Sequence, residues 1–156
     1  MRLRILTVGE NKVPYLVTGE ADYLRRLERY CRVEVASVRG EKIKGNRSTG
    51  EILGVEAERL VTQIPQGSFL VVLDRQGDSL SSEELARQIL DWQNRAVQEV
   101  IFLVGGPLGL GDEVLARADL VVSLSRMTFT HEMVRLILLE QLYRSFTILR
   151  GEKYHK

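Results

Sequence analysis

The sequence is poor in cysteine, and this scarcity excludes several classes of protein. Cys31 is the single cysteine among 156 residues, so the chain forms no internal disulfide framework and no multi-cysteine zinc site. No apolar run approaches the ~18 residues that a membrane-spanning helix needs. The apolar stretch after Met1 is also too short for a signal peptide. The sequence therefore predicts a soluble protein of a reducing compartment, the cytoplasm.

The sequence also lacks a strong net charge of either sign. Lys and Arg number 22 against 21 Asp and Glu, which gives a net charge of +1, so the whole molecule is not a polycation. Hydrophobic residues at 44% and charged residues at 28% are close to the globular average and exclude a disordered or fibrous chain. A chain of this length fits one domain, residues 1–156. Any nucleic-acid partner must be met by a local patch.

Short apolar runs alternate with amphipathic segments along the chain. Strands are expected over residues 4–8, 32–38, 69–73, 100–104 and 120–124. Helices are expected over residues 14–30, 51–63, 81–95, 113–118 and 130–148, with a polar loop over 39–50. This alternation predicts an α/β fold, with a mainly parallel sheet and helices on both faces.

A glycine-rich segment follows one of the three buried strands of the second half. Ligands of parallel sheets bind just beyond the carboxyl ends of the strands, which here fall at Asp74, Gly105 and Ser125. Residues 105–111 contain four glycines, more than a plain strand-to-helix turn needs. Glycines let backbone amides approach a ligand closely, so we expect a binding loop.

The glycine loop does not match a phosphate cradle. A P-loop needs Lys and Ser or Thr after its last glycine, whereas Gly111 is followed by Asp112 and Glu113. The dinucleotide fingerprint fails as well, because Val114 stands where its third glycine belongs. Since the two carboxylates would repel a phosphate, we expect an adenosyl-type or other small ligand without phosphates.

The segment from His131 to Arg135 begins like a zinc-protease motif but does not complete it. Arg135 stands where the second histidine ligand is required. With one cysteine and two histidines in the chain, a zinc site cannot be assembled, so we expect no metal. Cys31 is expected to be a small apolar side chain without a catalytic role.

The last expected helix is apolar around nearly its whole circumference. Its apolar residues are Val134, Leu136, Ile137, Leu138, Leu139, Leu142, Tyr143 and Phe146. A helix of this kind is buried on all sides, and we expect a second copy of the chain to cover it, with burial inside one chain as the alternative. Glu140 and Arg144, four residues apart, are most simply an ion pair on one face.

Basic residues are concentrated between Leu24 and Arg47. They are Arg25, Arg26, Arg29, Arg32, Arg39, Lys42, Lys44 and Arg47. Against these eight stand three acids, Glu28, Glu34 and Glu41, so the stretch carries a net charge of +5. Two interpretations stay open, a solvated helix face with its loop or a surface that contacts phosphates.

Several motifs together resemble one family over the full chain. They are Leu73-Asp74 with Gly77, the run Gly105-Gly106-Pro107 with Gly109-Leu110, residues 124–128 followed by His131, Arg135 and residues 139–144, and the terminal Tyr154-His155-Lys156. Val8-Gly9 and residues 23–26 also fit. The chain resembles the RlmH family, ribosomal RNA large-subunit pseudouridine N3-methyltransferases of the SPOUT class.

The resemblance implies a fold, an assembly and a cofactor. Family members are homodimers with a trefoil knot in the C-terminal half, and they bind S-adenosylmethionine in the knot. Matching positions imply cofactor contacts at Leu73, Gly105, Leu124, Ser125, Arg126, Met127, Thr128 and Phe129. These are the strand ends to which the parallel-sheet argument also points. Thr130 departs from the pattern, because many relatives have proline there.

The resemblance also implies a reaction, the methylation of N3 of a pseudouridine in helix 69 of 23S ribosomal RNA on the assembled ribosome. His155 is expected to take the imide proton, and Arg135, Arg144 or Tyr154 to hold the anionic base, with each tail placed over the neighbouring chain's cofactor. RNA contacts are expected from Arg25, Arg26, Arg29, Lys42, Lys44 and Lys156, and neither DNA nor a membrane is expected as a partner. Two alternatives stay open, a SPOUT methyltransferase with another RNA target and a non-catalytic ribosome-binding factor.

Overall fold

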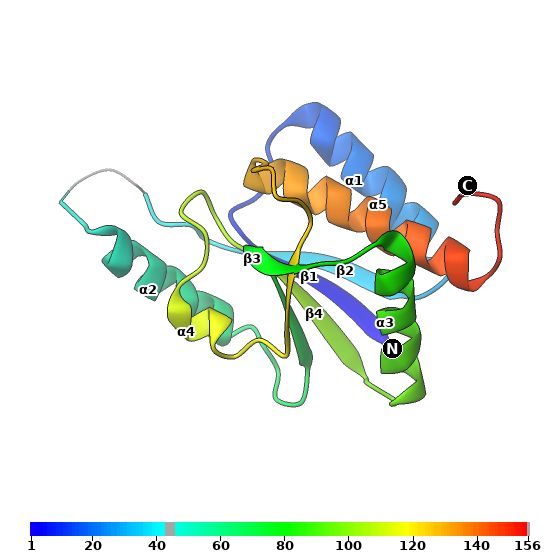
Figure 1. Cartoon of the computed structure of the whole chain (residues 1–156). Helices are drawn as coiled ribbons and strands as arrows, with labels where there is room; N and C mark the ends of the chain where they lie inside the picture. The colour runs from blue at the N-terminus through cyan, green and yellow to red at the C-terminus, as the bar shows by residue number, and fades with distance from the viewer. Residues whose placement is uncertain (43–45, 156) are drawn as a thin grey trace.

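Five parallel strands form one sheet in the order β2-β1-β4-β3-β5 (Figure 1), in a computed structural model that describes residues 1–42 and 46–155. The strands are β1 (Arg2–Val8), β2 (Arg32–Val38), β3 (Phe69–Ser79), β4 (Glu99–Val104) and β5 (Leu120–Ser123). The helices are α1 (Pro14–Leu27), α2 (Thr49–Val61), α3 (Ser82–Asn94), α4 (Asp112–Leu115) and α5 (His131–Leu149). The prediction of an α/β fold with a parallel sheet is confirmed.

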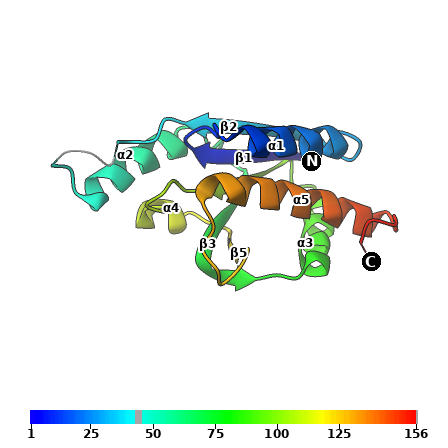
Figure 2. The same cartoon turned by 90° about the horizontal axis from the view of Figure 1, so that it is seen from above.

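Alternation along the strands creates one core on each face of the sheet. On β1, Leu3 and Ile5 enter a core that α1, α3 and α5 cover, whereas Leu6 and Val8 enter a second core that α2 and α4 cover. Figure 2 shows α1 running beside α5 over one side of the sheet. The predicted helices therefore cover both faces, as the fully apolar strands required.

Two capping boxes set the starts of α2 and α3. The Ser81 side chain accepts from the backbone N–H of Glu84, and the Glu84 carboxylate accepts from the backbone N–H of Ser81, as the sequence predicts. Ser48 and Glu51 form a second box of the same kind, so α2 begins at Thr49, two residues before the predicted start. The expected helix over 14–30 ends earlier, at Leu27.

Strand β3 is longer than its apolar run. After Leu73 the chain leaves the ladder and returns, so that Val122 of β5 pairs with both Leu73 and Asp78. A Cβ at Gly77 would lie 2.6 Å from the carbonyl carbon of Val121, so only glycine lets the two backbones pass this closely. Gly77 lies in the half of the chain in which the resemblance places the trefoil knot.

Helix α5 is largely covered within the single chain. Leu138, Leu139, Leu142 and Phe146 are each less than 4% exposed, and no residue of α5 is fully exposed. A Cβ at Gly19 would lie 3.0 Å from a methyl group of Leu136, which shows how closely α1 approaches. Burial within one chain, the stated alternative, thus accounts for much of the apolar circumference. The homodimer stays a prediction.

Three further sequence expectations concern the Cys31 thiol, a metal site and a membrane-spanning helix. Burial raises the pKa of Cys31 to about 11, so this half-buried side chain remains a thiol at neutral pH. The described residues contain no group of three or more His, Cys, Asp or Glu side chains able to hold a metal ion. Among residues 1–42 and 46–155, no helix is both long and apolar enough to cross a membrane.

Candidate functional site

A pocket of about 750 Å³ opens at the carboxyl ends of β3, β4 and β5. Its walls are residues 73–76, 104–110, 123–125, 127–132 and 134. Because parallel strands end at one edge of the sheet, three loops that are distant in sequence meet there. The first residues of α5, namely His131, Glu132 and Val134, form a further wall of the pocket.

The predicted cofactor contacts converge on this pocket. Seven of the eight line it, namely Leu73, Gly105, Leu124, Ser125, Met127, Thr128 and Phe129. Arg126, the eighth, lies between two lining residues and its side chain is exposed. Sequence reasoning missed Arg75 and Gln76 at the rim, although their position directly after a strand was a usable signal. Whether these residues bind the cofactor stays a prediction.

The glycine loop closes on itself. Gly106 and Gly109 form an isolated antiparallel bridge, and Gly109 has a φ of +84°, which favours glycine. A Cβ at Gly105 would lie 2.6 Å from the carbonyl oxygen of Gly109 and 2.9 Å from the Leu110 side chain. The glycines are therefore required by the loop's own path, and their backbone groups form one wall of the pocket.

The segment after β5 presents apolar side chains at the rim. Ser125 shapes it, because its hydroxyl accepts from the backbone N–H of Met127 at 3.0 Å. Met127 is 74% exposed and Phe129 is 38% exposed, unusual for large apolar side chains. Thr130 then caps α5, since its hydroxyl accepts from the backbone N–H of Met133 at 3.4 Å. The departure from proline at this position leaves a normal helix start.

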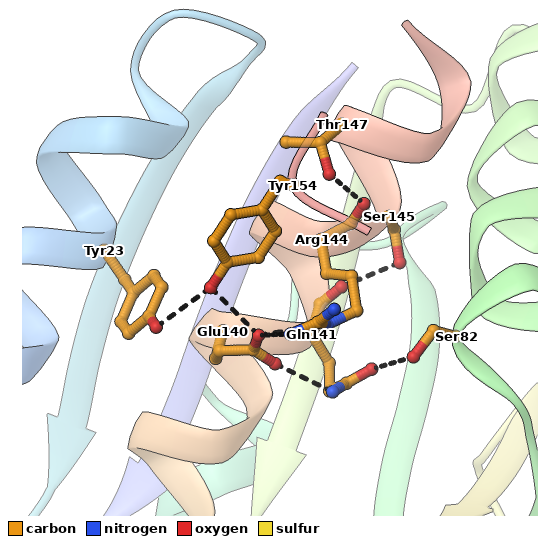
Figure 3. A network of polar contacts seen from close by, with 8 residues as sticks. All are labelled: Tyr23, Ser82, Glu140, Gln141, Arg144, Ser145, Thr147 and Tyr154. Atoms are coloured by element: carbon orange, nitrogen blue, oxygen red, sulfur yellow. Dashed lines mark hydrogen bonds and ion pairs between the residues drawn. The ribbon is translucent and has the colours of Figure 1, made fainter. Parts of the chain in front are cut away.

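A second group of predicted site residues lies at the other end of α5 (Figure 3). The Tyr154 hydroxyl donates to Oε1 of Glu140 at 3.1 Å and lies 3.2 Å from the Tyr23 hydroxyl of α1. Arg144 donates from Nε to Glu140 at 3.0 Å, which confirms the predicted ion pair, and its guanidinium covers the Tyr154 ring. Burial, followed by the hydrogen bond with Tyr23, raises the pKa of Tyr154, so the phenol stays protonated.

The other two predicted catalytic residues have partners of their own. Arg135 is buried and pairs with Glu20 of α1 at 3.0 Å, and Glu20 also accepts from the Asn11 amide at 2.6 Å. His155 lies with Nε2 2.7 Å from Oε1 of Glu83, near the start of α3. None of Arg135, Arg144, Tyr154 and His155 lines the pocket.

Helix length explains this separation. His131 lines the pocket, and Arg144 follows 13 residues later on the same helix, which corresponds to about 20 Å. The tail that carries Tyr154 returns to the Arg144 end of α5. One chain therefore supplies a pocket at one end of α5 and an aromatic and basic cluster at the other.

Comparison with known proteins decides the family. A family model described as "Predicted SPOUT methyltransferase" matches residues 1–155. The chain belongs to the SPOUT methyltransferase family. It is 48% identical over 156 residues to "Ribosomal RNA large subunit methyltransferase H" of Desulfotalea psychrophila, with all of both chains covered. It is 47% identical over 159 residues to the protein of the same name from Acetivibrio thermocellus, again with full coverage.

Solved structures show the same fold at low sequence identity. A probable methylase family protein from Haemophilus influenzae Rd KW20 has a TM-score of 0.55 and 11% identity, covering 99% of this chain and 70% of that chain. A structure from work on the 2-OH methylation of C/U34 on tRNA has a TM-score of 0.52 and 14% identity, covering 97% and 98%. The resemblance drawn from the motifs is confirmed, and the chain is a methyltransferase. The alternative of a non-catalytic factor loses its support.

The basic stretch of this SPOUT protein is partly neutralised by its own acids. Asp22 pairs with both Arg25 and Arg26, and the Arg26 contact holds the pKa of Asp22 below its ordinary value. Glu41 likewise pairs with Arg47 at 2.8 Å. Arg29 and Lys42 are exposed and have no acidic partner among the described residues. Two other predicted RNA contacts, Lys44 and Lys156, lie outside the described residues.

Proposed function

We propose that this methyltransferase transfers a methyl group from S-adenosylmethionine to N3 of a pseudouridine in helix 69 of 23S ribosomal RNA, on the assembled ribosome in the cytoplasm. The observation that carries the proposal is the pocket at the ends of β3, β4 and β5, in a chain that matches its relatives over full length. Those relatives, at 43–48% identity, are named as ribosomal RNA large-subunit methyltransferases.

The pocket fits S-adenosylmethionine in size and chemistry. Its volume of about 750 Å³ is in the range, roughly 300–1,000 Å³, of small-molecule and cofactor sites. Leu73, Leu110 and Val134 provide apolar walls for a base, and the glycine loop provides backbone polar groups. Asp74 and Glu132 line the same pocket and suit a positively charged ligand. When bound, the cofactor supplies a methyl group activated by a sulfonium.

The acceptor nitrogen must lose its proton for the reaction to proceed. An imide N–H is a weak acid, so a nearby base or a group that stabilises the anion accelerates the transfer. We assign the base role to His155. Arg144 and Tyr154 are half-buried at the surface and are better placed to meet a nucleotide than Arg135, which is buried against Glu20. In the single chain, the ion pair of Arg135 with Glu20 holds α5 against α1.

The separation within one chain makes a homodimer part of the proposal. The tail contacts Glu140 and Arg144, which follow the pocket residue Val134 by six and ten residues, about 9 and 15 Å along α5 and beyond hydrogen-bond reach of a ligand bound in the pocket of the same chain. A partner related by two-fold symmetry can bring its tail to this pocket and this chain's tail to its own. The exposed Met127 and Phe129 at the rim support such coverage.

The RNA is held by charge outside the pocket. Arg29 and Lys42, which have no acidic partner among the described residues, offer positive charge to the phosphates. Arg25 and Arg26 add positive charge that Asp22 partly neutralises. Phosphate contacts of this kind hold the RNA without reading its sequence. Lys44 and Lys156 remain further candidates for phosphate contacts.

Mass mapping of ribosomal RNA tests the function. Ribosomes from a strain that lacks the protein should lose one methyl group on a pseudouridine of helix 69, and purified protein with S-adenosylmethionine should restore it. A methyl group lost from another RNA would instead favour a SPOUT enzyme with a different target. An unchanged methylation map would refute the proposal.

A further inference from the structure

The last residues of the chain are fastened to three helices. Tyr154 bonds to Tyr23 of α1 and to Glu140 of α5 (Figure 3). His155 turns instead toward α3, where its Nε2 lies 2.7 Å from Oε1 of Glu83. Tyr154 and His155 therefore contact different helices, and these contacts fix the course of the backbone through both residues.

The start of α3 is itself fixed to α5. The Ser82 hydroxyl donates to Oε1 of Gln141 at 2.7 Å, and the Gln141 amide donates to Oε2 of Glu140 at 2.7 Å (Figure 3). Glu83 follows Ser82 directly, so its backbone is held close to α5 as well. The carboxylate that meets His155 therefore belongs to the residue next to Ser82, through which α3 joins the network that holds Tyr154.

Glu83 is ionised at neutral pH. Its own backbone N–H, the Ser81 hydroxyl and the His155 ring together hold the pKa of Glu83 below its ordinary value. An ionised carboxylate only accepts hydrogen bonds, so Nε2 of His155 must carry the proton in this contact. In the neutral ring the other nitrogen, Nδ1, is then the acceptor.

That second nitrogen has no partner. Nδ1 of His155 is buried and makes no hydrogen bond within the described residues. A buried acceptor without a donor costs free energy, which a donor arriving with a ligand would recover. The imide N–H of a uracil-type base is a donor of this kind. The His155 side chain is 31% exposed, so such a base can approach its ring from the solvent side.

We propose that Glu83 is a positioning residue for methyl transfer, which holds His155 in the Nε2–H form so that Nδ1 takes the imide proton. This rests on the proposed function. The N3–H bond breaks and its proton bonds to Nδ1. The electron pair left on N3 forms the bond to the methyl group, while the old methyl–sulfur bond leaves its electrons on sulfur. Glu83 balances the imidazolium charge until the proton passes to water.

The other charged groups near the tail have different partners. Arg144 covers the Tyr154 ring with 4.8 Å between its guanidinium carbon and the ring centroid, and it pairs with Glu140. Glu152 accepts from the Tyr30 hydroxyl at 2.7 Å. Within residues 1–42 and 46–155, Glu83 is the carboxylate that meets the His155 ring.

Histidine-selective ¹⁵N NMR tests the contact without any activity. The chain has two histidines, so His131, beside Glu132, provides an internal reference. At a pH where the rings are neutral, the ¹⁵N shifts of His155 should show a larger share of the Nε2–H form in the wild type than in Glu83→Ala. Asp91→Ala, which removes an exposed carboxylate from the same helix, should leave both rings unchanged. Equal shifts in the wild type and Glu83→Ala would overturn the proposal.

Kinetics then separates positioning from structure. Glu83→Ala should lower kcat about 10-fold with KM for both substrates unchanged, Glu83→Asp should restore part of the loss, and Asp91→Ala should match the wild type. If His155→Ala is inactive while Glu83→Ala keeps full kcat, the Glu83 proposal is wrong and the proposed function stands. If the wild type methylates no ribosomal RNA, the proposed function fails, and with it the catalytic role of Glu83.

Discussion

The two ends of α5 differ in how much of their surroundings is covered within one chain. At the C-terminal end, Tyr154 and Arg144 both bond to Glu140, and Tyr23 completes the network. At the N-terminal end, by contrast, Met127 and Phe129 stand exposed around an open pocket. The first end is organised within the single chain, whereas the second leaves an open pocket.

The comparison indicates a division of labour. A group that acts on a reacting atom must be held within a small distance of its working position, which the bonded tail provides. A pocket that admits and releases a cofactor must keep exposed surface. Since His131 at the pocket and Arg144 beside the tail are about 20 Å apart along α5, each chain of the proposed homodimer would offer half of a site.

Removing the tail should have the largest effect. A chain that ends at Lys153 should lose methyl transfer by at least ~100-fold, because it lacks the proposed base and the ring that contacts the nucleotide. Binding of S-adenosylmethionine, measured by calorimetry, should be unchanged, since neither Tyr154 nor His155 lines the pocket. Wild-type turnover by the shortened chain would show that the tail has no catalytic role.

Closing the pocket from its glycine loop should come next. Gly105→Ala places a Cβ 2.6 Å from the Gly109 carbonyl oxygen, so the loop must shift. We expect cofactor affinity to fall at least ~10-fold, about 1.4 kcal/mol. Gly54→Ala on α2 is the matched control, because its Cβ meets nothing within 4 Å and should raise stability by up to ~1 kcal/mol. Full affinity in Gly105→Ala would place the cofactor elsewhere.

The ion pair between α1 and α5 should matter chiefly for stability. Arg135→Ala leaves the buried Glu20 carboxylate without its cation, and we expect a loss of ~3 kcal/mol in the free energy of unfolding. Arg95→Ala removes a comparable pair on the surface of α3 and should cost less than ~0.5 kcal/mol. Denaturant unfolding measures both, and equal losses would contradict a buried structural role.

The smallest expected effect is on alkaline stability. Burial, with a further contribution from Glu152, raises the pKa of Tyr30 from 10.0 to about 12. The neutral phenol of Tyr30 therefore adds to the free energy of unfolding. This contribution is fully present below pH 10 and is lost as the pH rises toward about 12. In Tyr30→Phe, the free energy of unfolding should depend less on pH in this window. Denaturation followed by circular dichroism at several pH values measures this dependence. An unchanged slope would show that Tyr30 does not titrate as described.

The fold could be predicted where local sequence reflects burial. Residues 69–73 of β3 and residues 100–104 of β4 are apolar on both faces, and this alone indicates a parallel sheet between helix layers. The return of β3 at Asp78 and Ser79 could not be predicted, because these polar residues join the strand only through pairing with β5. The start of α2 was missed although Ser48 and Glu51 carry a capping signal.

The pocket was predictable and the tail was not. The carboxyl ends of parallel strands locate a ligand site from sequence, and they do so at Leu73 and Gly105. The position of Tyr154 depends on Tyr23 and Glu140, which are distant in sequence and whose contact no local pattern reveals. The motif resemblance named these residues, but the structure shows that one chain does not unite them with the pocket.

A mixed-dimer assay tests the central claim most directly, that the pocket of one chain works with the tail of another. The chain that ends at Lys153 is combined with full-length Gly105→Val, whose larger side chain should abolish cofactor binding, or with Thr128→Trp if that variant does not fold, and exchange of subunits is confirmed by mass spectrometry. Each variant alone should be nearly inactive, whereas mixed dimers should recover activity, because one of their two sites has both an intact pocket and an intact tail. Mixed dimers that stay as inactive as the two parents would contradict the account.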